Sequence, residues 1–343
     1  MSCSQTNLTP VTLSSIPAPV PSDVFTPISG QRLYVCDNPE PLTAATFSTP
    51  IVTLWDDIVP SSTLVNYRVF MWHHNDTGST IKYGLTVGNA GSNPITVGAV
   101  KYETTVTSNG GDILTNAGLC LAKSLLGQTL TSGSTVTVSS GAVQTVLEFT
   151  LAAGQVRGMV VEFTLSSASN MSAKVRTLAG NSSTAALNTH QGAVIGSVLT
   201  HPRGTWNYAD VQGAGATISL GSGGVSNSIS VLGSPLYGSP SVFPGTLPNS
   251  ASFGGVYKFN LTINNTSGTA QTANLYLNPR GGLFAGAVKV GSNPVYGIAK
   301  TTTDQGVKIG AFSLASGASV VVPIQLTTAG GSSTPVAFFV RNA

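Results

Sequence analysis

Charged side chains are scarce in this chain. Asp, Glu, Lys and Arg make up 8% of its 343 residues, against about a quarter in ordinary soluble domains. The formal net charge is +3, and neither the basic nor the acidic residues form a run. The basic footprint that binds phosphate groups is therefore missing, which argues against a nucleic acid partner.

A long apolar run is missing as well. The mean hydropathy is positive, at +0.24, yet the most apolar stretch, Val156 to Leu165, is interrupted by Arg157 and Glu162. A transmembrane helix needs about 18 or more consecutive apolar residues, so we expect no membrane span. The first residues contain neither a basic nor an apolar region, so we expect no secretory signal in this numbering. Either a leader was removed or the chain is made in a cytoplasm.

Cysteine is rare and odd in number, with only Cys3, Cys36 and Cys120. At least one thiol is therefore free or pairs with another chain. One interpretation is that the thiols are reduced and that two are buried as small apolar side chains. The other is an intermolecular disulfide, in which Cys3 joins Cys36 or Cys120 of a neighbouring chain once the two chains have docked.

Motifs of common enzymes are also absent, including the nucleophile elbow, the P-loop, the His-Glu-x-x-His helix and the Cys-x-x-Cys pair. His73 and His74 are adjacent, and adjacent strand residues point to opposite faces, so we do not expect them to share a metal ion. The same argument separates Asp56 from Asp57. The remaining candidates are isolated histidines and dispersed glutamates: His190, His201, Glu40, Glu103, Glu148 and Glu162. We therefore predict no catalytic, cofactor-binding or metal-binding residue, and no enzymatic activity.

What the chain does contain is a repeated segment. The stretch from Tyr67 to Gly78 returns from Tyr257 to Gly268 with the same spacing of Tyr, Asn and Gly. The tetrapeptide Gly-Ser-Asn-Pro also occurs twice, ending at Pro94 and at Pro294. The repeats indicate that one β-unit has been used twice.

Alternating apolar and polar runs of strand length, separated by turn residues, predict an all-β fold. We expect two antiparallel β-sandwich or jelly-roll-like modules related by internal duplication, with an extended, proline-rich N-terminal arm. The expected bounds are residues 1–30 for the arm, 31–180 for the first module, 181–227 for a Gly/Ser-rich connection and 228–343 for the second module. One short helix is expected near Gly118 to Leu126.

One predicted strand carries aromatic side chains on the face that should be polar. Phe70 and Trp72 stand where the second copy has an amide and a hydroxyl. An aromatic face requires a cover, which is the other module, a neighbouring subunit or a bound sugar. The residues predicted to form an interface or a sugar platform are Phe70, Trp72, Trp206 and Tyr208.

Four segments follow one another along the chain: Asp37-Asn-Pro-Glu40, His73-His-Asn75, Arg203-Gly-Thr-Trp206 and Leu277-Asn-Pro-Arg-Gly-Gly282. Their order resembles an uncharacterised group of extracellular proteins of Gram-positive, spore-forming bacteria. The resemblance implies a surface location and carries no catalytic residue with it. The start, Met1-Ser-Cys3, is similar to the cysteine-bearing N-terminal connectors of endospore appendage subunits.

These observations predict a structural, self-assembling subunit of an extracellular or spore-surface fibre or coat. The arm would add strands to an open sheet edge of the next copy, head-to-tail, with further contacts to cell-wall or spore-surface components. The anchoring residues of the arm would be Leu8, Val11, Leu13 and Ile16. The alternative is a carbohydrate-binding surface module that stays monomeric. No cofactor is expected for either function.

Overall fold

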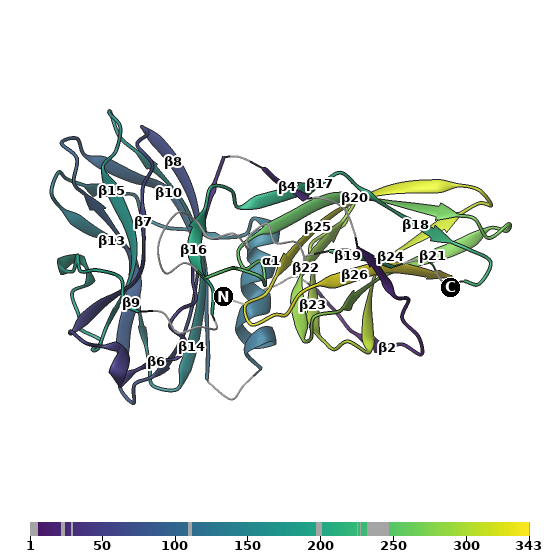
Figure 1. The fold of residues 1–343 in the computed structure, drawn as a ribbon, viewed down its shortest axis with the longest axis horizontal. Coiled ribbons are helices and arrows are strands. Elements are labelled where there is room, and N and C mark those ends of the chain that lie inside the picture. Colours follow the sequence, from purple (N-terminus) through teal and green to yellow (C-terminus); the bar gives the residue numbers. More distant parts are fainter. Residues whose placement is uncertain are drawn as a thin grey trace.

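The computed structural model describes residues 6–21, 25–28, 30–108, 112–196, 201–224, 226, 228–231 and 247–342. Most of these residues form β-strands, which are arranged in four sheets. Figure 1 shows two sandwiches side by side along the long axis, with helix α1 (Leu119–Gly127) between them. None of the described helices has the length and apolar character needed to cross a membrane.

The first module is a sandwich of an eight-stranded and a four-stranded sheet. The larger sheet consists of β11 (Thr131–Ser132), β10 (Ile95–Ser108), β14 (Gln155–Ser166), β8 (Leu64–Asp76), β5 (Arg32–Cys36) and β16 (Arg203–Trp206), with β12 (Val136–Val138) beside β10 and β6 (Leu42–Thr43) beside β8. The smaller sheet consists of β13 (Val143–Leu151), β9 (Ile81–Asn89), β15 (Ala173–Gly180) and β7 (Ile51–Ile58). Tyr34 and Met71 of the first sheet pack against Leu54 and Leu85 of the second in one buried cluster.

The second module pairs an eight-stranded with a six-stranded sheet. The larger sheet consists of β1 (Asn7–Leu8), β23 (Tyr296–Thr301), β22 (Phe284–Val290), β25 (Ser319–Thr328), β20 (Val256–Asn265), β17 (Asp210–Gly213) and β4 (Phe25–Ile28), with β18 (Ala216–Leu220) also beside β20. The smaller sheet consists of β2 (Val11–Thr12), β24 (Gln305–Leu314), β21 (Gln271–Pro279), β26 (Val336–Asn342), β19 (Ser228–Val231) and β3 (Pro19–Pro21). Short helical turns complete the described elements: η1 (Ala44–Thr46), η2 (Leu114–Gly118) and η3 (Leu187–Thr189).

The all-β sandwich fold is confirmed, and a short helix, α1, lies at the expected place. The pairing is less uniform than expected, because β5 and β6 both run parallel to β8, and β17 and β18 both run parallel to β20. Two strands of the arm, β1 and β3, also pair in parallel.

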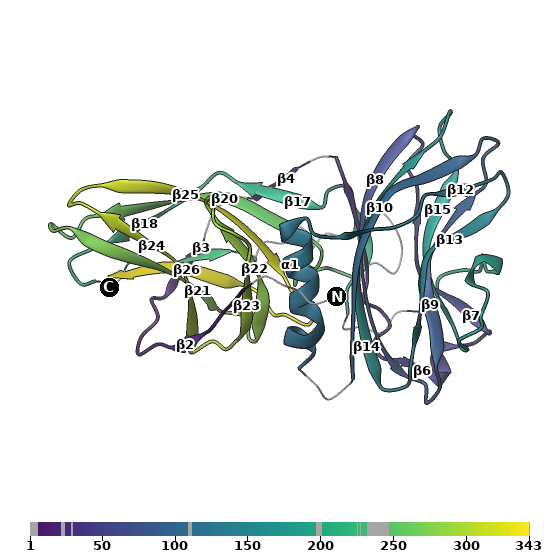
Figure 2. The same ribbon diagram turned by 180° about the vertical axis from the view of Figure 1, so that it is seen from behind.

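The module boundaries differ from those expected. The stretch 181–227 is not merely a connection, because β16 completes a sheet of the first module and β17 and β18 complete a sheet of the second. Helix α1 belongs to the first module by sequence, yet it packs against β22, β23 and β25 of the second (Figure 2). The two sandwiches therefore share one apolar cluster that continues across their boundary.

The arm is part of the second module. Strands β1 and β4 lie at the two ends of the larger sheet, and β2 and β3 lie at the two ends of the smaller one. Figure 1 shows the purple arm strands β2 and β4 against this sandwich. The arm was expected to pair with the next copy, but its described strands pair within this chain, because backbone groups that would be open at these edges bond to the arm instead. Strand addition between copies stays a prediction.

The repeated segments occupy equivalent places in the two modules. Nδ2 of Asn75, at the end of β8, donates to the carbonyls of Ser79 and Leu151, both at 2.8 Å. Nδ2 of Asn265, at the end of β20, donates to the carbonyls of Thr269 and Leu314, at 2.7 and 3.0 Å. The same local geometry is thus built twice, while the duplication itself stays a prediction.

Candidate functional site at the boundary between the modules

The aromatic side chains of β8 lie between the two modules. Phe70 and Trp72 are 1% and 2% exposed. Phe70 stacks on Phe253 of the second module, with 5.2 Å between ring centroids. Because their ring faces are covered within the chain, these two residues do not provide an exposed sugar platform.

The second predicted platform is covered as well. Trp206, in β16, is 5% exposed and belongs to the same apolar cluster. Tyr208 is half-buried and packs against that cluster. Stacking on a sugar requires an open ring face, which Trp206 lacks.

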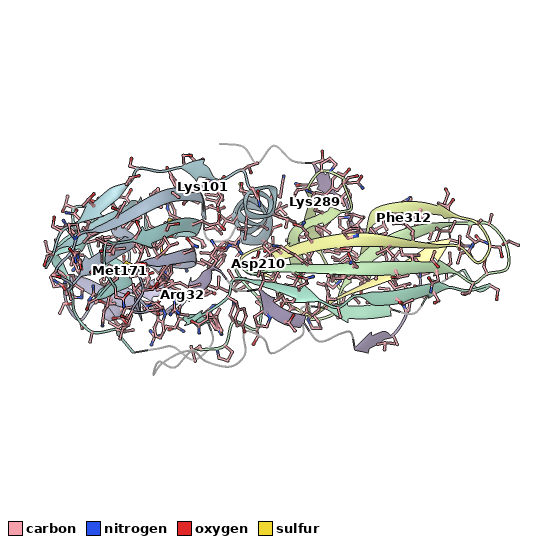
Figure 3. All side chains as sticks on the ribbon, turned by 90° about the horizontal axis from the view of Figure 1, so that it is seen from above. Arg32, Lys101, Met171, Asp210, Lys289 and Phe312 are labelled. Atoms are coloured by element: carbon pink, nitrogen blue, oxygen red, sulfur yellow. The ribbon has the colours of Figure 1, made fainter. Side chains whose placement is uncertain are left out.

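An ion-pair network also joins the modules. Arg68 of β8 is 6% exposed; it donates to Glu162 of β14 at 2.8 Å and to Asp210 of β17 at 2.5 Å. Lys258 donates to the other oxygen of Asp210, at 2.8 Å. Figure 3 shows Asp210 at the junction of the two sandwiches. The buried guanidinium therefore has carboxylate partners on both sides of the boundary.

A cavity of about 540 Å³ lies between the two modules, with Trp72 and Phe253 in its lining. We call it the boundary cavity. Its first-module wall includes Asp37, Glu40, Trp72, His74 and His201. The second module contributes Ser250, Ala251, Phe253, Gly331 and Ser332. Ionisable side chains of the first module thus face a wall of small side chains and one aromatic ring in the second.

Backbone pairing brings Asp37, Glu40 and His201 together, although His201 is distant in sequence. Strand β16 runs antiparallel to β5, with Arg203 opposite Cys36, so the residues just before β16 lie beside those just after β5. The Asp37 amide donates to the carbonyl of Pro202 at 3.0 Å. As a result, Nδ1 of His201 lies 3.1 Å from Oε2 of Glu40 and 3.6 Å from Oδ2 of Asp37. We call these three residues the boundary cluster.

The two carboxyl groups are unfavourably placed as anions. Burial raises the pKa of Asp37 well above its ordinary value, although a hydrogen bond with Glu40 opposes this rise. Burial, and then the neighbouring Asp37, raise the pKa of Glu40 to about 9, while His201 and a hydrogen bond from Trp72 act in the opposite direction. Such a pair can share a proton or bind a cation.

This cluster was not predicted, because Glu40 and His201 are isolated residues in the sequence. The only signal lay in the four segments whose order suggested a resemblance to proteins of spore-forming bacteria. Asp37 and Glu40 begin and end the first of those segments, and His74 lies within the second. His201 stands just before the third.

The adjacent residues His73 and His74 point to different surroundings, as expected, and so do Asp56 and Asp57. His73 is fully buried, with Nε2 at 3.6 Å from Sγ of Cys36, whereas His74 faces the boundary cavity. Asp57 is buried and paired with Arg32 at 2.8 Å, whereas Asp56 pairs with Lys174 at 2.8 Å. Neither adjacent pair can act as a unit. His190 is not part of the boundary cluster.

Cys36 does not fit the expected intermolecular disulfide. Cys36 is a free thiol with no exposed surface, and burial raises its pKa to about 12. It therefore cannot reach a neighbouring chain without local unfolding, so its part in an intermolecular disulfide is wrong. Cys120 is disulfide-bonded, and Cys3 lies outside the described residues.

The predicted anchoring residues lie along the second module of the same chain. Leu8 is half-buried against its apolar cluster, and Leu13 and Ile16 are half-buried as well. Val11 is 48% exposed. Three of the four therefore pack to some degree, and Val11 packs least.

A second cavity, of about 730 Å³, lies in the first module and is lined by Arg176, Lys174, Gln191, Ser61 and Ser172 among others. Arg176 is 6% exposed, and its Nε and Nη1 have no hydrogen-bond partner within the described part of the chain. Burial lowers the pKa of this guanidinium, although Asp56 acts in the opposite direction. We call this the Arg176 cleft, and its unmet donors favour an anionic ligand.

Comparison with known proteins gives no family. No family model and no curated protein matches this chain. Among solved structures, the tandem CBM22 domains of Paenibacillus barcinonensis Xyn10C match at 8% identity over 84% of this chain and 78% of theirs, with a TM-score of 0.17. The CUB1-EGF-CUB2 domain of human MASP-1/3 matches at 12% identity over 93% and 99%, with a TM-score of 0.19. Scores this low carry no argument about function.

Proposed function

We propose that this protein is a non-enzymatic, self-assembling structural subunit of an extracellular or spore-surface fibre or coat, in which copies exchange their N-terminal arms. The observation that supports this function is the position of the arm at both ends of both sheets of the second module. The arm of a neighbouring copy can make the same backbone pairs, so exchange would link two chains without creating a new interface.

The arm contacts are suited to exchange. Its strands are only two to four residues long, and Val11 and Val20 remain 48% and 52% exposed. Each contact on its own is therefore weak, and the arm is held by the sum of four pairings. Gly30, with φ of 119°, lies where the arm passes into the first module. A glycine adopts such a backbone angle without a steric penalty, which favours a change of direction at this point.

Exchange from one copy to the next is head-to-tail and can continue into an open filament. The low charge content favours this, since like subunits repel one another little. We propose cell-wall or spore-surface components as further partners.

A disulfide that holds the arm on its own chain tests this function. Leu8 of β1 is the registered partner of Ile298 of β23, so the double substitution Leu8→Cys with Ile298→Cys should lock β1 in place. We expect the wild-type chain to form polymers in electron micrographs and the oxidised variant to stay monomeric. All of these chains carry Cys120→Ser, so that a reductant acts on the engineered disulfide and not on the native one. A reductant should then restore polymerisation, and the single variant Leu8→Cys should polymerise under both conditions.

Two results would contradict arm exchange. The first is a wild-type protein that remains monomeric at every concentration in light scattering. The second is a locked variant that polymerises as well as the wild type, since its arm cannot leave. Deletion of residues 2–30 should likewise abolish polymers, and it should destabilise the second module because four edge strands are lost.

Binding of an acidic glycan is a second candidate function, favoured by the Arg176 cleft. A carboxylate of a uronic acid would satisfy the buried donors of Arg176, which have no partner among the described residues. We expect retention on immobilised polygalacturonate but not on cellulose, and loss of retention in Arg176→Met. Equal binding by the variant would remove this candidate and leave arm exchange untouched.

A further inference from the structure

The boundary cluster has ligand atoms at metal-binding separations. Ligands at about 2.0–2.1 Å from a tetrahedral Zn²⁺ lie about 3.3 Å from one another. The two distances from Nδ1 of His201, 3.1 Å to Glu40 and 3.6 Å to Asp37, are close to that value. All three ligand atoms lie within 4.8 Å of one another.

Protein groups do not satisfy all the polar atoms at the boundary cluster. Asp37 is 2% exposed, yet its Oδ1 has no hydrogen-bond partner among the described residues. Within that part of the chain, His201 is the ion-pair partner of both carboxylates, and no Lys or Arg pairs with either. Nε2 of His74, on the wall of the same cavity, also lacks a partner. Buried carboxylates without compensating cations are costly, so a bound cation would complete the cluster.

We propose that Asp37, Glu40 and His201 bind one divalent transition-metal ion, such as Zn²⁺, at the boundary between the modules. One imidazole nitrogen with two carboxylate oxygens suits Zn²⁺ and its neighbours, whereas Ca²⁺ takes oxygen ligands alone. The remaining coordination positions face the boundary cavity and are left for water or for a ligand that enters it. This site does not depend on arm exchange.

The support around the cluster is consistent with a metal site. The carbonyl of His201 accepts a hydrogen bond from Nδ2 of Asn38 at 3.1 Å, and Trp72 hydrogen-bonds to Glu40. The first contact fixes the backbone of His201, and the second holds the ligand side chain of Glu40, as outer contacts of metal sites do. Because Trp72 also packs between the modules, the ion would be coupled to the packing at the boundary.

Calorimetric titration of the full-length chain, after treatment with EDTA and dialysis, tests this proposal. We expect one Zn²⁺ per chain and a rise in thermal midpoint on binding. Glu40→Gln and His201→Gln should each weaken Zn²⁺ binding about tenfold or more, since even outer contacts of metal sites contribute about that much. Glu40→Gln removes one of two neighbouring carboxylates and keeps the size of the side chain, so this variant should fold. Circular dichroism of both apo-proteins checks folding.

Matched controls use the same substitutions away from the cluster. Glu148→Gln and His190→Gln should bind Zn²⁺ like the wild type, and Cys36→Ser should too, which excludes the nearby thiol as the ligand. Absence of Zn²⁺ binding would overturn the proposal, as would binding that survives in Glu40→Gln and His201→Gln. A preference for Ca²⁺ over Zn²⁺ would overturn the assigned class of metal.

Discussion

The indole ring of Trp72, in the first module, lies directly against Gly330 of the second. A Cβ atom on Gly330 would come within 2.5 Å of ring atoms Cε3 and Cζ3. A Cβ atom on Gly158 of β14 would likewise come within 2.5 Å of Cε3 of the Trp72 ring. The absence of two side chains therefore makes space for one large ring at the boundary.

Trp72→Ala should consequently destabilise the protein by about 3–5 kcal/mol, as large-to-small substitutions in cores do. Urea unfolding gives the difference in free energy. Val321→Ala is the control, because Val321 is 59% exposed and should change stability by no more than about 0.5 kcal/mol. An unchanged midpoint for Trp72→Ala would mean that the modules do not pack through this residue.

Asp210 should make the free energy of unfolding depend on pH in the acidic range. Burial alone would raise its pKa, but Arg68 and Lys258 outweigh burial and hold the pKa below its ordinary value. Its contribution is then fully present above the unfolded pKa of about 3.9 and is lost as pH falls through the lower folded value. Asp210→Asn should cost about 3–5 kcal/mol at neutral pH, because it leaves Arg68 buried with one partner fewer.

Urea titrations from pH 7 to pH 2 measure this dependence. The gap in stability between wild type and Asp210→Asn should be constant at neutral pH and should close below about pH 4. The exposed Asp76 provides the control, since Asp76→Asn should open no such gap. A gap that stays constant down to pH 2 would show that Asp210 is not an ion-pair partner.

Thiol titration should distinguish the three cysteines. Cys36 has no exposed surface and Cys120 is disulfide-bonded, so we expect neither residue to react with Ellman's reagent in the native state. After unfolding without a reductant, Cys36→Ser should lower the count of reactive thiols by one, and Cys120→Ser should raise it by one, because the partner of Cys120 is released. A count that does not rise in Cys120→Ser would contradict the bonded state of Cys120.

Asn75 and Asn265 should contribute equally to their modules. Replacing either by Ala leaves buried carbonyls unpaired, Leu151 in one module and Leu314 in the other. We expect each substitution to cost about 1–3 kcal/mol. Chemical unfolding of both variants, with the exposed Asn181→Ala as control, tests whether the two turns are equivalent. A loss in only one variant would show that they are not.

Much of the fold follows from local pattern. Alternation placed His73 and His74 on opposite faces, and the turn residues delimited strands such as β8 and β20. The helix near Gly118 was also foreseeable, because the run around Leu121 and Leu125 is apolar at helical spacing. The candidate site could not be predicted in the same way, since Glu40 and His201 meet only because β16 pairs with β5.

The sequence by itself determined the long strands of the two modules, their two faces, the turns and the low charge of the surface, but not β16, β17 and β18. These depend on alternation and on turn residues, which act over a few positions. The tertiary structure alone decided that Phe70 and Trp72 face the second module and that Asp37 gains a histidine neighbour. It also decided that the arm lies on the edges of its own chain. Such contacts depend on the order of strands in a sheet and on packing between sheets, and neither is encoded in neighbouring residues.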